Sequence, residues 1–269
     1  MANMTVPLWR QSNFLKLWTS QTISQIGSQV TFLALPLVAV LTVDASPAEM
    51  GVLTAMGSLP PLLFGLHVGV AVDRRNRRPL IVMSDAGHAV LLGLIPIAWL
   101  LGTLTMEWLY VIAFLTGALS LVAGIAHQAL LPAIVARDQL VDANSKMALS
   151  ATAAQVAGPT LASGLVQIFT APVAIAADAV SYLLSALMIS RIRVVESTIS
   201  RTRRRGRVWH DIVQGLRLAL GDERLRALIG ARVLLNFFNA MLEAVFVIYI
   251  IQELGIAVAL IGIIFSIGG

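Results

Sequence analysis

The chain has 269 residues, of which 58% are hydrophobic and only 12% carry a charge, and its mean hydropathy is +0.85. Since a soluble domain is about 25% charged, this composition excludes an ordinary soluble protein and predicts a membrane protein. We attribute the net charge of +5 to basic loops on one side of a bilayer, and the absence of cysteine excludes disulfides and Cys-based metal sites.

Long apolar stretches predict eight membrane-spanning helices, because a bilayer core about 30 Å thick needs about 20 helical residues. A hairpin is expected at Thr170–Pro172, since proline disfavours helix at the residue before it. The eighth span starts near residue 256, and because the chain ends inside it we expect a fragment of a longer protein. The other seven spans are expected at residues 14–43, 50–72, 79–101, 108–136, 147–169, 172–190 and 227–253.

The basic residues predict the orientation of these spans. With the N-terminus placed inside, all 19 Lys and Arg fall in inside loops or at the inside ends of spans, and the outside loops hold none. Basic loops resist translocation, so we expect the N-terminus and residues 191–226 to be cytoplasmic in a bacterial inner membrane.

Three regions follow from this pattern. Residues 1–190 are expected to form a six-helix bundle, and residues 227–269 the first two helices of a second bundle. Between them, residues 191–226 form a basic linker that includes an amphipathic helix. Its arginine run at 201–207 is interpreted as a topology anchor that contacts anionic lipid, with nucleic-acid binding as the less favoured alternative.

The turn between the second and third spans carries the most specific motif. It reads Gly69-x-x-x-Asp73-Arg74-x-x-Arg77-Arg78 and resembles the signature loop of the major facilitator superfamily. Asn76 stands where that pattern has glycine, and asparagine tolerates the positive φ that such a turn uses. The sequences LWRQSNFLKLWTSQTISQIGSQV, ARDQLVDANS and WHDIVQGLRLAL further resemble the branch of macrolide-efflux and enterobactin-exporter-like carriers.

This resemblance implies an all-α major facilitator fold, with two six-helix bundles around a central cavity. It also implies that the loop residues Gly69, Asp73, Arg74, Arg77 and Arg78 latch one conformation through charge contacts, with enforcement of topology alone as the less favoured alternative. Gly158, Pro159 and Gly164 in the fifth span resemble the Gly-Pro helix-bend motif of exporters. The alternative for these three residues is ordinary packing of small side chains.

Ionisable residues at membrane depth are costly, so they are functional candidates by default. Asp85 and His88 lie one turn apart in the third span, and Asp178 lies in the sixth. Two further stripes of polar residues follow single helix faces. They comprise Gln21, Gln25 and Ser28 in the first span and Arg232, Asn236, Asn239 and Glu243 in the seventh.

A carboxylate kept away from water can exchange a proton near neutral pH, so Asp178, Glu243 and Asp85 are candidates for proton coupling. Each has a structural alternative, namely an interhelical hydrogen bond or ion pair; for Asp85 this includes pairing with the loop arginines. His88 and His127 are interpreted as packing or pore-lining residues, because no second ligand stands at metal-binding spacing.

Together with the resemblance, these observations predict a proton-coupled secondary transporter that works by alternating access. The resemblance further implies export of a small amphipathic molecule of the drug or siderophore class. Its expected partners are substrate, protons and lipid, with no nucleic acid, and a monomer is favoured. We expect no cofactor or metal and no enzymatic activity, since no P-loop, H-E-x-x-H or G-x-S-x-G occurs. The alternatives are an intramembrane enzyme and a non-transporting membrane interaction protein.

Overall fold

The computed structural model describes residues 7–193, 217, 221–254 and 258–268. All regular structure in these ranges is helical, as predicted. The short helices η1 (Leu8–Arg10) and η2 (Arg137–Gln139) precede the long helices α1 and α5. The long helices are α1 (Ser12–Thr42), α2 (Pro47–Asp73), α3 (Arg77–Leu100), α4 (Met106–Ile134), α5 (Leu140–Phe169), α6 (Ala171–Ile189), α8 (Glu223–Gln252) and α9 (Val258–Gly268).

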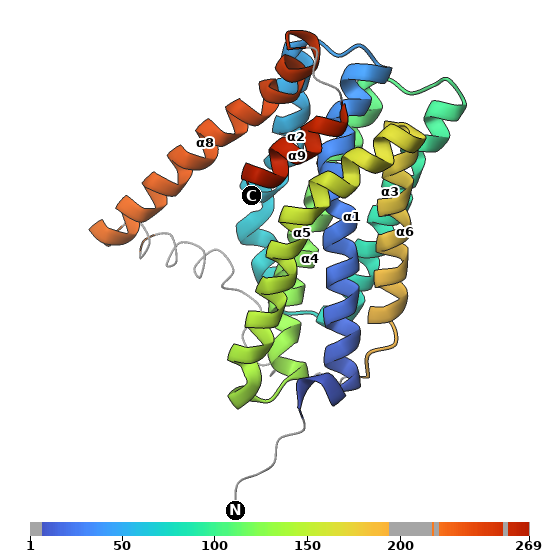
Figure 1. The fold of residues 1–269 in the computed structure, drawn as a ribbon. Helices are drawn as coiled ribbons and strands as arrows, with labels where there is room; N and C mark the ends of the chain where they lie inside the picture. Colours follow the sequence, from blue (N-terminus) through green and yellow to red (C-terminus); the bar gives the residue numbers. More distant parts are fainter. Residues whose placement is uncertain (1–6, 194–216, 218–220, 255–257, 269) are drawn as a thin grey trace, which may run out of the picture.

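Helices α1 to α6 pack side by side as one bundle, with their connections alternating between its two ends (Figure 1). α1 and α3 both pack on α6, while α2 packs on α4 and α1 on α5. The α5–α6 hairpin turns at Thr170, where the sequence predicted it, and Thr170 adopts a positive φ of 93°. The arginine run of the linker, and most of its predicted amphipathic helix, lie outside the described residues.

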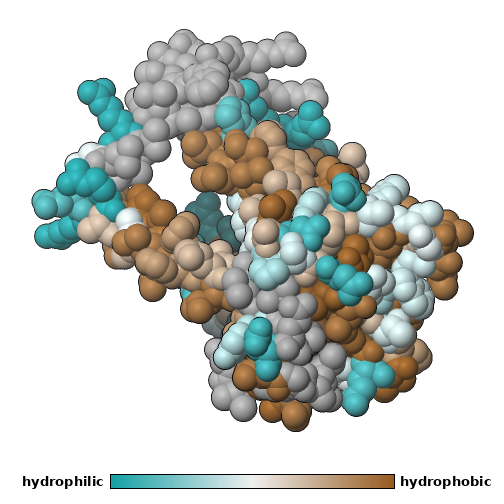
Figure 2. All heavy atoms as spheres, turned by 90° about the horizontal axis from the view of Figure 1, so that it is seen from above, coloured by the Kyte–Doolittle hydropathy of each residue, from teal (hydrophilic) through white to brown (hydrophobic). Residues whose placement is uncertain are grey.

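Helices α8 and α9 belong to the predicted second group. α9 packs along α5, whereas α8 contacts α2 and α1 and diverges from the bundle toward its first residue (Figure 1). Six of the described helices are long and apolar enough to cross a membrane, namely α1, α2, α3, α4, α6 and the Glu223–Leu242 part of α8. Hydrophobic side chains also cover much of the flanks of the molecule in Figure 2, as lipid contact requires.

The interior of the bundle is divided along its length. One apolar cluster includes Val30, Leu33 and Leu37 of α1, Leu92 of α3 and Ile112 of α4, and it lies toward the α5–α6 hairpin. The other includes Leu17, Ile81 and Leu130 and lies toward the opposite end. Between these levels α1, α3 and α6 bury the polar residues Ser20, Ser24, Ser84, Asp85, His88, Ser181 and Ser185, with Asp178 at the boundary.

Candidate functional site

We use the name polar layer for the group of polar side chains between the two apolar clusters. It is formed where α1, α3, α4 and α6 meet. Its members are Ser28 and Thr31 of α1, Asp85 and His88 of α3, Ser120 of α4, and Asp178, Ser181, Tyr182 and Ser185 of α6.

Asp178 is the most constrained member of the polar layer. It is 1% exposed, and its carboxylate accepts hydrogen bonds from Thr31 Oγ1 at 2.5 Å and from Ser181 Oγ at 2.9 Å. Both donors are neutral hydroxyl groups, and no cationic partner is found within the part of the chain that the structure describes. The arrangement satisfies the carboxylate without fixing its charge by an ion pair.

Gly27 allows α1 to approach Asp178. A Cβ at this position would collide with Ser181 Oγ and with Asp178 Oδ1, so only glycine permits this approach of the two helices. Close approach through a small residue is a common way for membrane helices to pack. Gly27 therefore helps to hold the hydroxyl of Thr31, one turn further along α1, against the Asp178 carboxylate of α6.

Tyr182 and His88 connect α6 to α3 and α4. Their rings stack with centroids 4.2 Å apart and planes inclined by 8°. The Tyr182 hydroxyl lies 2.9 Å from Ser28 Oγ, and His88 Nε2 lies 3.0 Å from Ser120 Oγ. Because His88 Nδ1 faces the Ser84 carbonyl at 2.9 Å, and a carbonyl only accepts, the neutral imidazole carries its proton on Nδ1.

Asp85 is the second buried carboxylate, with 2% of its surface exposed. Ser185 Oγ donates a hydrogen bond to Asp85 Oδ2 at 2.7 Å. Among the described residues this hydroxyl, and not a loop arginine, is its partner, so the alternative of an arginine pair is wrong here. Each of the two acids is thus held by a serine of α6, Asp178 by Ser181 and Asp85 by Ser185, one turn apart along that helix.

The other predicted candidates do not join the polar layer. Arg232, Asn236 and Asn239 are exposed on α8, and the side chain of Glu243 lies outside the described part. Gln25 is partly buried, and its Oε1 atom has no hydrogen-bond partner within the described residues. The structure therefore brings Asp85, His88 and Asp178 together in one layer but not the stripe of the seventh span.

Sequence reasoning missed three members of the polar layer, namely Thr31, Ser120 and Tyr182, whereas it had placed Ser28 in the polar stripe of the first span. A signal was present on α1, where Ser20, Ser24, Ser28 and Thr31 recur every three to four residues and so share one face. No comparable signal marks Ser120. In the described ranges, no three His, Asp or Glu side chains lie close enough together to hold a metal ion.

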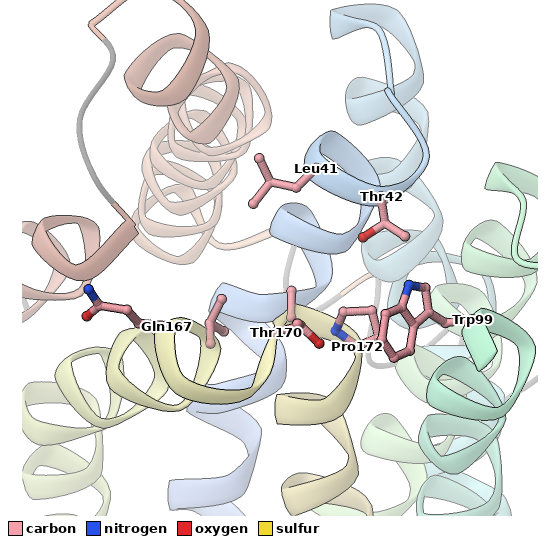
Figure 3. A pocket seen from close by; sticks show the side chains of 8 residues that line it. Leu41, Thr42, Trp99, Gln167, Thr170 and Pro172 are labelled. Carbon is pink, nitrogen blue, oxygen red and sulfur yellow. The ribbon is translucent and has the colours of Figure 1, made fainter.

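A cavity of about 610 Å³ opens at the hairpin end of the bundle, beyond the first apolar cluster (Figure 3). It is lined by the end of α1, by Trp99 of α3 and by the α5–α6 hairpin. Its lining residues are Leu41, Thr42, Trp99, Val166, Gln167, Thr170, Ala171 and Pro172. This lining is mainly apolar with a few hydrogen-bonding groups, and none of the candidate acids contributes to it.

Residues 17–269 match the sequence profile of the Major Facilitator Superfamily. The match covers nearly the whole chain and includes every helix of the polar layer. The chain belongs to the Major Facilitator Superfamily. This confirms the predicted fold class of an all-α membrane protein with a major facilitator fold.

Two other similarities agree with membership of the superfamily. The chain is 34% identical over 88 residues to an uncharacterized MFS-type transporter, YfiS, of Bacillus subtilis (strain 168), a match that covers 32% of this chain and 21% of that protein. It also resembles the crystal structure of a bacterial homolog of the human lysosomal transporter Spinster, in an inward-facing and unoccupied conformation. That likeness has a TM-score of 0.74 at 15% identity and covers 97% of this chain and 59% of the other, so the chain spans little more than half the length of that protein.

The α2–α3 turn, whose motif resembles the superfamily's signature loop, lies at the end of the bundle opposite the α5–α6 hairpin. Asp73 is the last residue of α2 and is exposed, while Arg77 and Arg78 begin α3. Arg78 donates hydrogen bonds to the carbonyls of Ile189, at 3.2 Å from Nε, and Ser190, and so caps the end of α6. Asn76 has φ −65° and ψ 126°, so the expected positive φ is wrong and this turn closes without a left-handed residue.

The Gly-Pro motif lies on α5 between two neighbours. A Cβ on Gly158 would collide with the side chain of Gln29 on α1, whereas a Cβ on Gly164 would meet open space. On the α9 side, the Thr160 and Ser266 hydroxyls lie 2.8 Å apart. Gly262 of α9 sits so close to the Pro159 carbonyl and Ser163 that a Cβ would collide with both. The small residues of α5 therefore admit close neighbours on two sides.

Proposed function

We propose that this protein is a secondary active transporter that exports a small amphipathic molecule in exchange for protons. The observation that carries the proposal is the polar layer, in which two buried carboxylates have hydroxyl donors and no cationic partner among the described residues. A carboxylate in this setting can take up and release a proton without breaking an ion pair. Asp178 is the principal proton carrier in this proposal, with Asp85 in support.

Alternating access would expose the layer to one side of the membrane at a time. Asp178 lies at the boundary with the apolar cluster nearer the hairpin, and Asp85 lies on the other side of Tyr182 and His88. The Asp73 and Arg74 turn would act as the conformational latch, and Gly158, Pro159 and Gly164 would accommodate movement of α5. On α8, Arg232, Asn236, Asn239 and Glu243 would face the substrate path from the second bundle.

The motif resemblance to macrolide-efflux and enterobactin-exporter-like carriers favours drugs or siderophores as the substrate class. The relative from Bacillus subtilis supports a bacterial protein, and the positive-inside pattern supports an inner membrane with the N-terminus and residues 191–226 in the cytoplasm. Membership of a transporter superfamily favours transport over an intramembrane enzyme or a non-transporting interaction protein.

The proposal is tested by measuring whether protons and substrate cross a sealed membrane together, in opposite directions. The full-length protein is reconstituted in liposomes that contain a pH-sensitive dye, with an acidic lumen. A panel of lipophilic cationic dyes, macrolides and catecholate siderophores is then added. We expect at least one compound to accumulate while protons leave the lumen, and both fluxes to stop when an ionophore collapses the gradient. Substrate accumulation that stays the same after the pH gradient is collapsed would contradict the proposed coupling.

A further inference from the structure

We propose that Ser181 is a positioning residue that lets Asp178 gain and lose a proton without any movement of the helices. This inference rests on the proposed function, in which Asp178 carries the coupled proton. It starts from two acceptors that lie within reach of one hydroxyl group. Ser181 Oγ lies 2.8 Å from the main-chain carbonyl oxygen of Asp178 and 2.9 Å from Oδ1 of the same residue.

The Ser181 hydroxyl can serve only one of these acceptors at a time, because a hydroxyl group has one proton to donate and two lone pairs with which to accept. When Asp178 is ionised, the hydroxyl proton points to Oδ1, while Thr31 donates to Oδ2 at 2.5 Å. Each carboxylate oxygen then accepts one hydrogen bond, as a buried carboxylate requires.

Protonation of Asp178 reverses the direction of one of these hydrogen bonds. A proton that arrives at Oδ1 forms an O–H bond there, neutralises the carboxylate and is donated to Ser181 Oγ. The proton of Ser181 turns about the Cβ–Oγ bond toward the main-chain carbonyl of Asp178, and Thr31 continues to donate to Oδ2. Each of these polar groups keeps a partner and no heavy atom moves. Release of the proton from Oδ1 reverses these steps.

The other carboxylate oxygen of Asp178 is a poorer place for the proton. An acid proton on Oδ2 would be donated to Thr31 Oγ1, and the proton of Thr31 would then need a new acceptor. Among the described residues, Asp178 Oδ2 is the one acceptor of the Thr31 hydroxyl. The exchangeable proton therefore belongs on Oδ1, beside Ser181.

Asp85, the second buried acid, lacks this arrangement. Ser185 Oγ donates to Asp85 Oδ2 at 2.7 Å, and within the described ranges this oxygen is the one acceptor of that hydroxyl. A proton on Asp85 Oδ2 would leave the Ser185 hydroxyl without an acceptor there. A serine thus serves one protonation state at Asp85 and both states at Asp178.

Few other ionisable groups share the level of Asp178. α1, α3 and α5 pack on α6, and α1 meets Asp178 at Gly27 and Thr31, where its sequence holds no ionisable residue. α3 contributes Asp85 and also His88, whose two ring nitrogens are engaged by the Ser84 carbonyl and by Ser120. The remaining ionisable residues of α1, α3 and α5 lie in the first two turns of these helices and are Lys16, Arg77, Arg78, Asp142 and Lys146.

Tyr182, four residues along α6 from Asp178, is engaged as well. Ser28 Oγ lies 2.7 Å from the Ser24 carbonyl and 2.9 Å from the Tyr182 hydroxyl. Because the single proton of Ser28 goes to the carbonyl, which can only accept, the tyrosine is the donor to Ser28. The protons of Tyr182 and His88 are therefore used elsewhere, and the exchange at Asp178 Oδ1 depends on Ser181.

The experiment records infrared difference spectra of the detergent-solubilised full-length protein while the pH is lowered. A protonated carboxyl group gives a C=O stretching band of its own, and the part of this signal that disappears in Asp178→Asn belongs to Asp178. The test variant is Ser181→Ala. The matched control is Ser20→Ala, which removes another buried serine that donates to the carbonyl three residues before it, and whose hydroxyl bonds to no carboxylate among the described residues.

We expect the Asp178 band of the original protein at the low-wavenumber end of the carboxyl range, because the acid accepts from Thr31 and donates to Ser181. In Ser181→Ala the band should move to higher wavenumber, since the acid proton has lost its acceptor, and Ser20→Ala should leave the band in place. A band of the original protein at the position of a carboxyl group without hydrogen bonds would overturn the proposal, whether or not the variants fold.

The remaining outcomes separate this inference from the proposed function. An Asp178 band that Ser181→Ala does not move, or that both serine variants move equally, would overturn the role of Ser181 while Asp178 still takes up a proton. A spectrum from which Asp178→Asn removes no band would show that Asp178 stays ionised, and would overturn its proton-carrying role together with the role of Ser181.

Discussion

The α6 face and the α8 face carry similar polar patterns in different surroundings. On α6, Asp178, Ser181 and Ser185 recur at three and four residues and are all buried against α1 or α3. On α8, Arg232, Asn236 and Asn239 recur at the same spacing and are all exposed. A polar stripe therefore identifies a helix face but not what covers it. The partner of the stripe on α6 is a second polar face on α1, and this pairing creates the polar layer.

The largest effect is expected from changing the contact that brings α1 and α6 together. Gly27→Ala places a methyl group against Ser181 Oγ and Asp178 Oδ1, and overpacking of this kind costs about 3 kcal/mol. The apparent Tm of the detergent-solubilised protein, followed by tryptophan fluorescence, should fall clearly. The matched control is Gly93→Ala in α3, where nothing lies within 4 Å of the new methyl group, and its Tm should stay near that of the original protein. Equal Tm values for the two variants would argue against a close α1–α6 contact.

A smaller loss is expected when one acid loses its hydrogen-bond donor. Ser185→Ala leaves the buried Asp85 carboxylate without its hydroxyl, which costs about 1–2 kcal/mol. Combining it with Asp85→Ala should cost less than the sum of the two single changes, because the interaction is then removed from both sides. Additive losses of apparent Tm would show that the hydroxyl and the carboxylate do not interact. Ser190→Ala serves as the control, because this serine just beyond α6 is only partly buried and its hydroxyl donates to the Leu187 carbonyl of its own helix.

The smallest effect on stability is expected on α8. Asn236→Ala removes an exposed amide, and surface changes of this kind stay within about 0.5 kcal/mol. Transport should nevertheless fall if this stripe faces the substrate path, as proposed. A large drop in apparent Tm would indicate that Asn236 is buried by another helix in the assembled protein. The polar stripe of α8 would then be covered like that of α6, which contradicts the comparison.

Hydropathy and loop charge predicted most of the fold of this chain. Each expected span from residue 14 to residue 190 corresponds to one described helix, and the hairpin turns at Thr170 as expected. α5 and α8 begin earlier than expected, at Leu140 and Glu223, because a helix continues through polar residues once its later turns are packed. Asn76 was misjudged because the pattern of a motif does not fix the backbone angles of its turn.

The candidate site was only partly predictable. Asp85, His88 and Asp178 were recognised because ionisable residues are conspicuous in apolar helices. Thr31 was not recognised, since a threonine in a membrane helix ordinarily donates to a backbone carbonyl of its own helix and so does not by itself indicate a polar site. Its role, like the stacking of Tyr182 on His88, depends on which helices pack together, and the periodicity of one helix carries no information about its neighbour.

The most direct test of the account compares two kinds of transport in the Asp178→Asn variant. Asparagine keeps the shape of the side chain and can still meet the Thr31 and Ser181 hydroxyls, but it cannot carry a proton. In liposomes, we predict that the variant still exchanges labelled for unlabelled substrate without a gradient, yet no longer accumulates substrate when a pH gradient is imposed. Accumulation driven by the pH gradient at the level of the original protein would contradict the claim that Asp178 carries the coupled proton.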